Sequence, residues 1–238
     1  MKNGDFVKIE YTGRVKDTKE IFDTTDESLA KENNIFKEDT KYGAVNIIVG
    51  AGHVVSGLDK KLLEIDANAS SKFDVLPEDA FGKRDSKLIK VISSTQFRKE
   101  KIVPVPGQYI TLGNNVSGKI LSASSGRVRV DFNHLLAGKI LEYDVKTLGL
   151  ITEPIKKLDV ITGFYFGGLG QKIETSLSEG KAGISMPKAF FKFVPDDLRK
   201  KIEGDIKKYV EGVKEVSFSE QKEKEEKDTQ TAAKEAPK

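Results

Sequence analysis

Four short stretches decide the fold of this chain: residues 22–23 (Phe-Asp), 54–58 (Val-Val-Ser-Gly-Leu), 77–82 (Pro-Glu-Asp-Ala-Phe-Gly) and, before them, 7–13 (Val-Lys-Ile-Glu-Tyr-Thr-Gly). Each stretch is weak evidence alone. Together they supply aromatic and aliphatic side chains around one carboxylate, with no pattern typical of a nucleophile or of a set of metal ligands. A site of that composition suits a reaction that breaks no covalent bond.

The composition predicts a soluble protein with a highly charged surface. Of 238 residues, 37% are hydrophobic and 32% are charged, and the net charge of +3 is too close to balance to predict nucleic-acid binding. No run approaches the roughly 20 apolar residues that span a bilayer, and no apolar signal segment precedes the first alternating strand. The absence of cysteine rules out disulfides. We therefore predict a cytoplasmic protein that binds neither membranes nor nucleic acids.

The first 88 residues have the pattern of strands around one short helix. Residues 7–11 alternate apolar and polar side chains, as a half-buried strand does, and residues 45–49 and 73–75 are expected to form two more strands. Residues 24–44 are a polar segment that leads into the strand expected at residues 45–49. The helix follows a glycine turn at residues 50–52, and we expect its apolar face to consist of Leu58, Leu62 and Leu63.

From residue 88 the pattern changes to short β-like runs separated by Gly and Asn turns. These runs are residues 90–97, 102–106, 109–110, 116–120 and 128–132. The last run alternates apolar residues with Arg127, Arg129 and Asp131, which indicates one arm of a hairpin. Residues 133–138 are expected to turn the chain into a final strand at residues 141–145.

The four opening motifs, in this order and spacing, resemble the FKBP family of peptidyl-prolyl cis–trans isomerases. Residues 133–138 (Asn-His-Leu-Leu-Ala-Gly) are similar to a segment of the branch that the bacterial protein SlyD typifies. That branch carries a β-rich insert-in-flap domain between the motif at residues 77–82 and the last barrel strand. The resemblance covers residues 1–150, and the further C-terminal extension is similar to that of long archaeal members.

The resemblance implies an isomerase that needs no cofactor, with a proline-binding pocket and catalytic site at the positions that match the family motifs. Val45 is a less direct match. In the family, the N–H at the position of Val55 holds a substrate carbonyl. The implied site residues are Tyr11, Phe22, Asp23, Val54, Val55, Leu58, Phe81 and Tyr143.

An apolar residue taken singly is more often part of a core than of a site, so packing is the alternative for each of these positions. The joint occurrence of Asp23 with the spaced motifs favours the pocket. Two residues depart from the family pattern: Leu58 stands where the best-known eukaryotic members have tryptophan, and Phe81 stands where many members have tyrosine. Leu58 makes tight binding of their macrolide inhibitors doubtful, but catalysis should survive both differences.

In SlyD-like relatives the inserted domain exposes apolar surface that binds unfolded chains, which implies chaperone activity here. The expected partners are unfolded or partially folded proline-containing polypeptides. The alternative is that the same apolar residues form only a small β core. The residues that we expect to contact clients are Tyr109, Ile110, Val128, Val130 and Phe132.

A further unit is expected beyond Glu153 and Pro154. We expect strands at residues 160–166 and near Ile173 and Ile184, and a last strand at residues 216–218. A Gly-rich turn lies at residues 167–170, and a helix is expected to start at Pro195 with its apolar face at Leu198, Ile202, Ile206 and Tyr209/Val210. A homodimer is predicted through this unit, because so short a segment rarely buries many large aromatic groups alone. These groups are Phe164, Tyr165, Phe166, Phe190, Phe191 and Phe193.

We therefore expect an α+β fold, with an FKBP-like antiparallel β-sheet wrapped on a short helix, an inserted small β domain and a C-terminal α+β domain. The expected divisions are residues 1–88 plus 133–150 for the isomerase domain, 89–132 for the insert, 155–218 for the C-terminal domain and 219–238 for a disordered charged tail.

Two other classes of function stay open on the residues alone. A holdase with a vestigial pocket is the main alternative to an enzyme. An RNA-associated β-barrel would need a basic and aromatic face, for which Arg127 and Arg129 beside Phe132 are too few. No metal site is expected, because the only histidines, His53 and His134, lie on different motifs and the chain has no cysteine.

Overall fold

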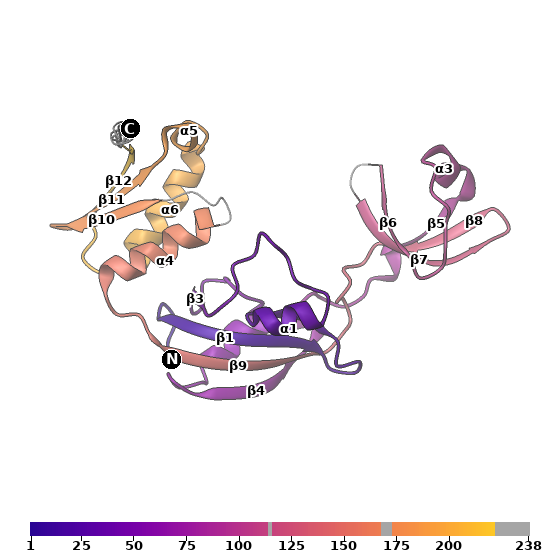
Figure 1. The fold of residues 1–238 in the computed structure, drawn as a ribbon, viewed down its shortest axis with the longest axis horizontal. Coiled ribbons are helices and arrows are strands. Elements are labelled where there is room, and N and C mark those ends of the chain that lie inside the picture. Colours follow the sequence, from indigo (N-terminus) through magenta and orange to yellow (C-terminus); the bar gives the residue numbers. More distant parts are fainter. Residues whose placement is uncertain (114–115, 168–172, 222–238) are drawn as a thin grey trace, which may run out of the picture. The chain divides into compact units, whose positions relative to one another are not determined.

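The computed structural model describes residues 1–113, 116–167 and 173–221. The chain divides into two compact units, Met1–Ile151 and Thr152–Lys238 (Figure 1). Both strands and helices occur in each unit, which confirms the α+β class. Within the described residues, no helix is long and apolar enough to cross a membrane.

The first unit is built on a five-stranded sheet that is antiparallel throughout. Its strand order is β2-β1-β9-β4, and β3 also pairs with β1. The strands are β1 (Phe6–Val15), β2 (Ile21–Thr24), β3 (Val45–Ile48), β4 (Ser70–Val75) and β9 (Leu141–Leu150). The alternation predicted for β1 is observed, since Val7, Ile9 and Val15 are fully buried on one face of the sheet.

Two helices accompany this sheet. In α2 (Ser56–Leu62), Leu58 and Leu62 are buried in the main core. Leu63, expected on the same face, is instead 36% exposed, because it is the C-cap residue and lies past the last helical turn. The polar segment at residues 24–44 contains a helix that was not expected, α1 (Glu27–Glu32), whose first N–H groups are capped by the Asp26 carboxylate.

The inserted segment forms its own four-stranded antiparallel sheet with strand order β5-β8-β7-β6. The elements are β5 (Ile89–Ser93), α3 (Ser94–Lys99), β6 (Tyr109–Leu112), β7 (Val116–Ser124) and β8 (Arg127–Asp131). A separate core contains Phe97, Ile110, Leu112, Ile120, Val128 and Val130.

One of the β-like runs expected in the insert, residues 90–97, is a strand only as far as Ser93, and another is not a strand. Phe97 lies in α3, because the Ser93 hydroxyl accepts the Thr95 N–H and starts a helix after only five strand residues. Residues 102–106 pair with no strand, and Pro104 and Pro106 have no N–H to donate to a ladder.

The chain passes from the part built on the main sheet into the insert, and back again, at two adjacent points. The short helices η1 (Pro77–Asp79) and η2 (Ser86–Leu88) precede the insert. At the exit, the Phe132 N–H donates to the Leu88 carbonyl at 3.0 Å. Asp85 and Asn133 are joined by two hydrogen bonds of 2.8 and 2.9 Å. Because both chain crossings are tied together, the insert is attached to the main sheet at a narrow neck.

Within its described residues, the second unit has three helices and a mixed sheet with strand order β10-β11-β12. The strand pair β10-β11 is antiparallel, and β11-β12 is parallel. Its elements are α4 (Pro154–Phe166), β10 (Glu174–Ser178), β11 (Lys181–Met186), α5 (Lys188–Phe191), α6 (Asp196–Tyr209) and β12 (Glu215–Glu220).

The strand predicted at residues 160–166 is wrong, because this segment is the second half of α4. Its β-branched and aromatic residues favour a strand locally, but Pro154 begins a helix in which Leu158, Ile161 and Thr162 are buried. The Thr162 hydroxyl donates to the Leu158 carbonyl at 3.0 Å, which satisfies it inside the helix. The helix expected from Pro195 is present as α6, with Ile202 and Ile206 buried.

The aromatic residues of this unit are not uniformly exposed. Phe164 and Phe193 are 52% and 83% exposed, whereas Phe166 is buried, contrary to expectation. The predicted charged tail begins inside β12, which includes Ser219 and Glu220, and residues 222–238 lie outside the described residues. Of the predicted turn at residues 167–170, only Gly167 is described, as the C-cap of α4.

Candidate functional site

Three neighbouring strands bring aromatic rings together at one end of the main sheet. Tyr11 on β1 and Tyr143 on β9 have ring centroids 6.2 Å apart. Phe22 on β2 meets Tyr143 edge-to-face at 5.9 Å and meets Phe81 edge-to-face at 6.5 Å. Edge-to-face contacts hold the rings at fixed angles, so they form a cluster of defined geometry. We call this set with Asp23 the aromatic pocket.

Gly13 makes this close approach possible. A Cβ atom at this position would lie 2.6 Å from Phe22 Cζ and 3.1 Å from Tyr143 Cε1. Real Cβ contacts are not that short, so any other residue must displace a pocket ring. Gly13 lies on β1 opposite both Asp23 and Tyr143, where the pairing with β2 becomes irregular. The motif at residues 7–13 therefore ends in glycine for a packing reason.

We expect Gly13→Ala to lower kcat/KM for a prolyl peptide by about tenfold, because displacement of a positioned group by less than 1 Å can cost that much. The measurement is peptide isomerisation without a coupling protease. The matched control is Gly204→Ala, where the added methyl group meets no atom within 4 Å. Unchanged activity in a folded Gly13→Ala variant would show that the exact placement of Phe22 does not matter.

Asp23 is the carboxylate of the aromatic pocket, and it is exposed. Its Oδ2 accepts a hydrogen bond from the Tyr11 hydroxyl at 2.8 Å. Burial, and then the Asp23 charge, raise the pKa of the Tyr11 phenol above its ordinary value, and both causes act in the same way on Tyr143. Both phenols therefore stay protonated at neutral pH, and Tyr11 acts as a hydrogen-bond donor.

The start of α2 supplies the apolar floor. Val54 and Val55 immediately precede the helix and pack against the main core, and Leu58 is buried one turn later. Asp59 holds this segment in place, because its carboxylate accepts the Gly50 and Gly52 N–H groups at 2.7 and 3.1 Å. Sequence reasoning missed Asp59; the one available signal was a carboxylate in the first turn of a helix that follows a glycine turn.

Phe81 completes the wall and is supported by the return segment of the chain. The His134 ring stacks on it with centroids 4.3 Å apart and an interplanar angle of 3°. His134 Nδ1 accepts the Leu136 N–H at 3.2 Å, and the Gly138 N–H donates to the Gly82 carbonyl at 2.8 Å. The sequence placed His134 in the turn at residues 133–138 and did not indicate its contact with Phe81, which the fold creates.

The residues predicted for the pocket lie in one neighbourhood of the first unit. Leu58 and Tyr143 are core residues, 1% and 3% exposed, so the packing alternative also describes them. Phe73, which was not predicted, stacks on Tyr143 at 6.4 Å and supports it from β4. The partly buried residues packed against this core include Tyr11, Phe22, Val45, Val54, Val55 and Phe81.

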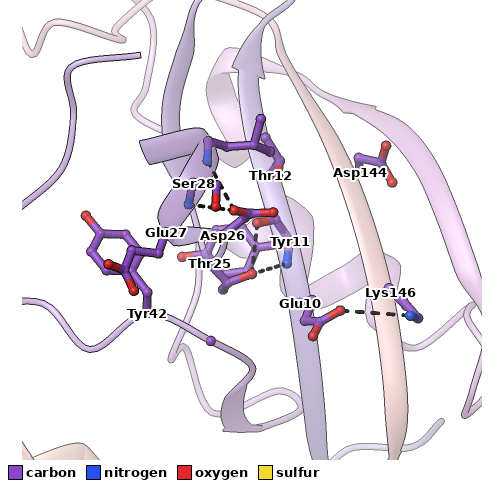
Figure 2. Close-up of a pocket in the computed structure, with 12 residues that line it drawn as sticks. Glu10, Tyr11, Thr12, Thr25, Asp26, Glu27, Ser28, Tyr42, Asp144 and Lys146 are labelled. Carbon is purple, nitrogen blue, oxygen red and sulfur yellow. Dashed lines mark hydrogen bonds and ion pairs between the residues drawn. The ribbon is translucent and has the colours of Figure 1, made fainter. Parts of the chain in front are cut away.

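A second depression, of about 500 Å³, lies between α1 and strands β1 and β9 (Figure 2). Its lining is mostly polar, and many of these groups satisfy one another. The Tyr11 N–H donates to Thr25 Oγ1 at 3.0 Å, and Lys146 Nζ lies 4.0 Å from a Glu10 carboxylate oxygen. Tyr11 and Tyr42 are the only aromatic residues among those that line it, and Phe22, Phe81 and Tyr143 do not, so we do not assign the proline site to it.

The residues predicted for client binding in the insert fall into two groups. Ile110, Val128 and Val130 are 6%, 1% and 0% exposed, so in the folded insert they form its core. Tyr109 is 53% exposed, and Phe132 is half-buried. Phe132 also lines a mostly apolar groove of about 450 Å³, which we call the insert groove. The other lining residues are Leu88, Lys90, Ile92, Gln96, Leu112, Gly113 and Val116.

The titratable residues were also compared with the needs of a metal site. Within residues 1–113, 116–167 and 173–221, no group of three or more His, Cys, Asp or Glu side chains is arranged to hold a metal ion.

The family models that match this chain lie within the first unit. Residues 1–98 match the family model of FKBP-type peptidyl-prolyl cis-trans isomerases, and residues 90–136 match the model of the FKBP26 IF domain. A short-type peptidyl-prolyl cis-trans isomerase of Methanocaldococcus jannaschii is 32% identical over 146 residues, which is 61% of this chain and 91% of that protein. The FKBP-type isomerase SlyD of Helicobacter pylori is 28% identical over 166 residues, 68% of this chain and 80% of that protein.

Proposed function

This chain belongs to the family of FKBP-type peptidyl-prolyl cis-trans isomerases, and on that basis we propose that the aromatic pocket is its active site. The protein is a peptidyl-prolyl cis-trans isomerase, which accelerates rotation about X–Pro bonds. The observation that carries the assignment is the Tyr11–Asp23 hydrogen bond beside a cluster of contacting rings from different parts of the chain.

The pocket suits this reaction because it can change the free energy of the planar amide relative to that of the twisted amide. Rotation about the unassisted peptide bond crosses a barrier of roughly 18–20 kcal/mol. Lowering it by about 5 kcal/mol would increase the rate roughly 10³–10⁴-fold. The planar amide is a strong resonance dipole that water solvates well, and twisting removes the resonance. An apolar wall made of Phe22, Phe81 and Tyr143 therefore disfavours the planar state relative to the twisted one.

Two polar groups would fix the substrate during this rotation. The Val55 N–H precedes the first turn of α2, where backbone donors have no carbonyl partner inside the helix, so it can donate to a substrate carbonyl. The Tyr11 hydroxyl is oriented by Asp23 and adds a second polar group at the pocket edge. Holding one side of the amide while the other turns converts binding energy into orientation. No group needs to exchange a proton.

We further propose that residues 89–132 act as a client-binding domain and that residues 1–88 plus 133–150 form the catalytic domain. The insert groove supports this role, because Leu88 and Val116 on its rim are 40% and 49% exposed. Its clients are unfolded or partially folded proline-containing polypeptides. Capture by the insert raises the local concentration of X–Pro bonds at the aromatic pocket.

The competing function is a holdase whose pocket is vestigial. Two assays separate them: a protease-free assay on short prolyl peptides, and refolding of a protein whose folding is limited by proline isomerisation. We expect the full chain to accelerate both. Suppressed aggregation with no acceleration of either reaction would favour the holdase.

We also propose that the chain forms a homodimer through residues 155–218. The support is the exposure of Phe164 and Phe193, since exposed large aromatic groups mark interaction surfaces. A two-fold dimer is the commonest closed assembly. The buried positions of this unit, including Phe166, leave a smaller apolar surface than the sequence indicated. The cytoplasmic location inferred from the sequence stays a prediction.

Truncation after Ile151 should leave peptide isomerisation unchanged and convert a dimer into a monomer. The truncated chain keeps the Ile151 N–H, which donates to the Phe6 carbonyl at 2.8 Å and completes the main sheet. Sedimentation at micromolar concentration measures the association. Phe193→Ser is the matched point variant and should weaken the dimer with activity intact. A full-length monomer would leave client binding as the better account of this surface.

A further inference from the structure

A third depression, of about 220 Å³, lies next to the aromatic pocket on the side of Phe81. The two sites share a boundary residue, His134, whose ring stacks on Phe81 and also lines this depression. Residues from the insert and from the segments on either side of it contribute to the lining. They include Arg84, Tyr109, Lys119, Asp131, His134 and Lys139, and we call this site the cationic depression.

The lining carries three cationic side chains and one carboxylate, and the carboxylate already has hydrogen-bond and ion-pair partners within the chain. Asp131 forms an ion pair with Arg84 and accepts hydrogen bonds from Asn133 at 2.6 and 3.0 Å. Partial burial raises the pKa of the Asp131 carboxyl, but the hydrogen bonds from Asn133 and Arg84 outweigh this effect and hold it below its ordinary value. Asp131 therefore stays ionised and neutralises Arg84, and the positive charge of the other two cations remains.

Lys119 and Lys139 supply that remaining charge. Among the described residues, neither ammonium group has a carboxylate within ion-pair distance. The Lys119 ammonium lies 5.3 Å from the centroid of the Tyr109 ring, which keeps it beside the depression without reducing its charge. Two cations without a carboxylate partner, beside a third that has one, favour the binding of an anionic group from another molecule.

We propose that the cationic depression binds an anionic side chain of the client, a carboxylate or a phosphorylated hydroxyl, close in sequence to the isomerised proline. This proposal rests on the assignment of the active site to the aromatic pocket. The His134 ring is 4.3 Å from Phe81, and an extended peptide advances roughly 3.3 Å per residue. A chain with its proline against Phe81 therefore reaches Lys119 and Lys139 within a few residues. The depression makes the enzyme selective for prolines with an acidic neighbour.

The test uses three sets of prolyl peptides that differ only at one position, scanned from three residues before the proline to three after it. The position holds glutamine, glutamate or phosphoserine. At low salt, we expect glutamate or phosphoserine at one position to raise kcat/KM about threefold to fivefold over glutamine, the range of exposed ion pairs. The gain should fall in 1 M salt, where charges are screened over about 3 Å. A gain confined to phosphoserine would identify the ligand as a phosphate.

The decisive variant is Lys119→Gln/Lys139→Gln. It should give the same kcat/KM for all three peptides, and its kcat/KM for the glutamine peptide should equal that of the unmodified protein. The control, Lys8→Gln/Lys146→Gln, removes the same charge from the other face of the main sheet and should retain the preference. Equal kcat/KM for all three peptides at every position, or a preference that survives in Lys119→Gln/Lys139→Gln, would overturn the proposal. Failure to turn over even the glutamine peptide would instead refute the active-site assignment.

Discussion

Phe22→Ala should lower kcat/KM for a short prolyl peptide by at least about tenfold, which corresponds to the loss of roughly 1.4 kcal/mol of transition-state stabilisation. The Phe22 ring contacts both Tyr143 and Phe81, so its removal opens the aromatic pocket on two sides and lets water reach the amide. The ring is only half-buried, so the fold should persist. The measurement is protease-free peptide isomerisation, with near-ultraviolet circular dichroism to verify the fold.

Tyr143→Ala should lower activity at least as much. However, Tyr143 is 3% exposed, and truncating a buried aromatic side chain typically costs about 3–5 kcal/mol of folding stability, so a loss of activity could come from unfolding. The informative comparison is therefore Phe22→Ala with Asp23→Ala/Phe22→Ala. The matched control is Phe36→Ala, which removes a ring that stacks on Tyr42 and not on a ring of the aromatic pocket. Full activity in a folded Asp23→Ala/Phe22→Ala double variant would remove the aromatic pocket from consideration as the active site.

Replacing residues 89–131 by a short Gly-Asn turn should preserve peptide isomerisation within about twofold and lower the acceleration of protein refolding by about tenfold or more, since the effective concentration of the client is lost. The replacement is feasible because the Phe132 N–H and the Leu88 carbonyl already form a hydrogen bond of 3.0 Å across the neck. Suppression of aggregation should be lost in parallel. The two assays are run on the same preparation.

A point variant separates client binding from the mere presence of the insert. Val116→Ser alters the insert groove. It should reduce the acceleration of protein refolding without changing kcat/KM for short prolyl peptides. Val103→Ser is the control, because Val103 is 75% exposed and is not one of the groove-lining residues. If insert removal reduces both activities equally, the insert supports the fold of the catalytic domain, and client binding must be sought elsewhere.

Four strands of the main sheet, β1, β3, β4 and β9, were predictable because local pattern and tertiary packing agree there. Val7, Ile9 and Tyr11 alternate with polar residues, and the structure buries or half-buries that face. The helix α4 shows the opposite case. Residues 160–166 are rich in β-branched and aromatic side chains, yet Pro154 starts a helix that packs against α6. Helix packing therefore overrides local strand propensity in this segment.

Exposure in the insert could not be read from the sequence either. Ile110, Val128 and Val130 are as apolar as Val91, Val103 and Val116, but the first three are buried and the others are 49–75% exposed. The difference depends on which face of the sheet each residue occupies and on what covers that face. Here α3 contributes Phe97 to the core, and the sequence had indicated a strand at that position.

By itself, the sequence determined the family, indicated strands at residues 7–11, 45–49, 73–75 and 141–145, and predicted the pocket residues, because short motifs at fixed spacing and alternating side chains carry that information without knowledge of contacts. Only the tertiary structure decided how these residues act together. The gap that Gly13 leaves for Phe22, the Asp59 carboxylate that holds the 50–52 loop and the His134 ring against Phe81 are contacts between different elements of the fold. No local pattern encodes such contacts, because they depend on where the folded sheet places each segment.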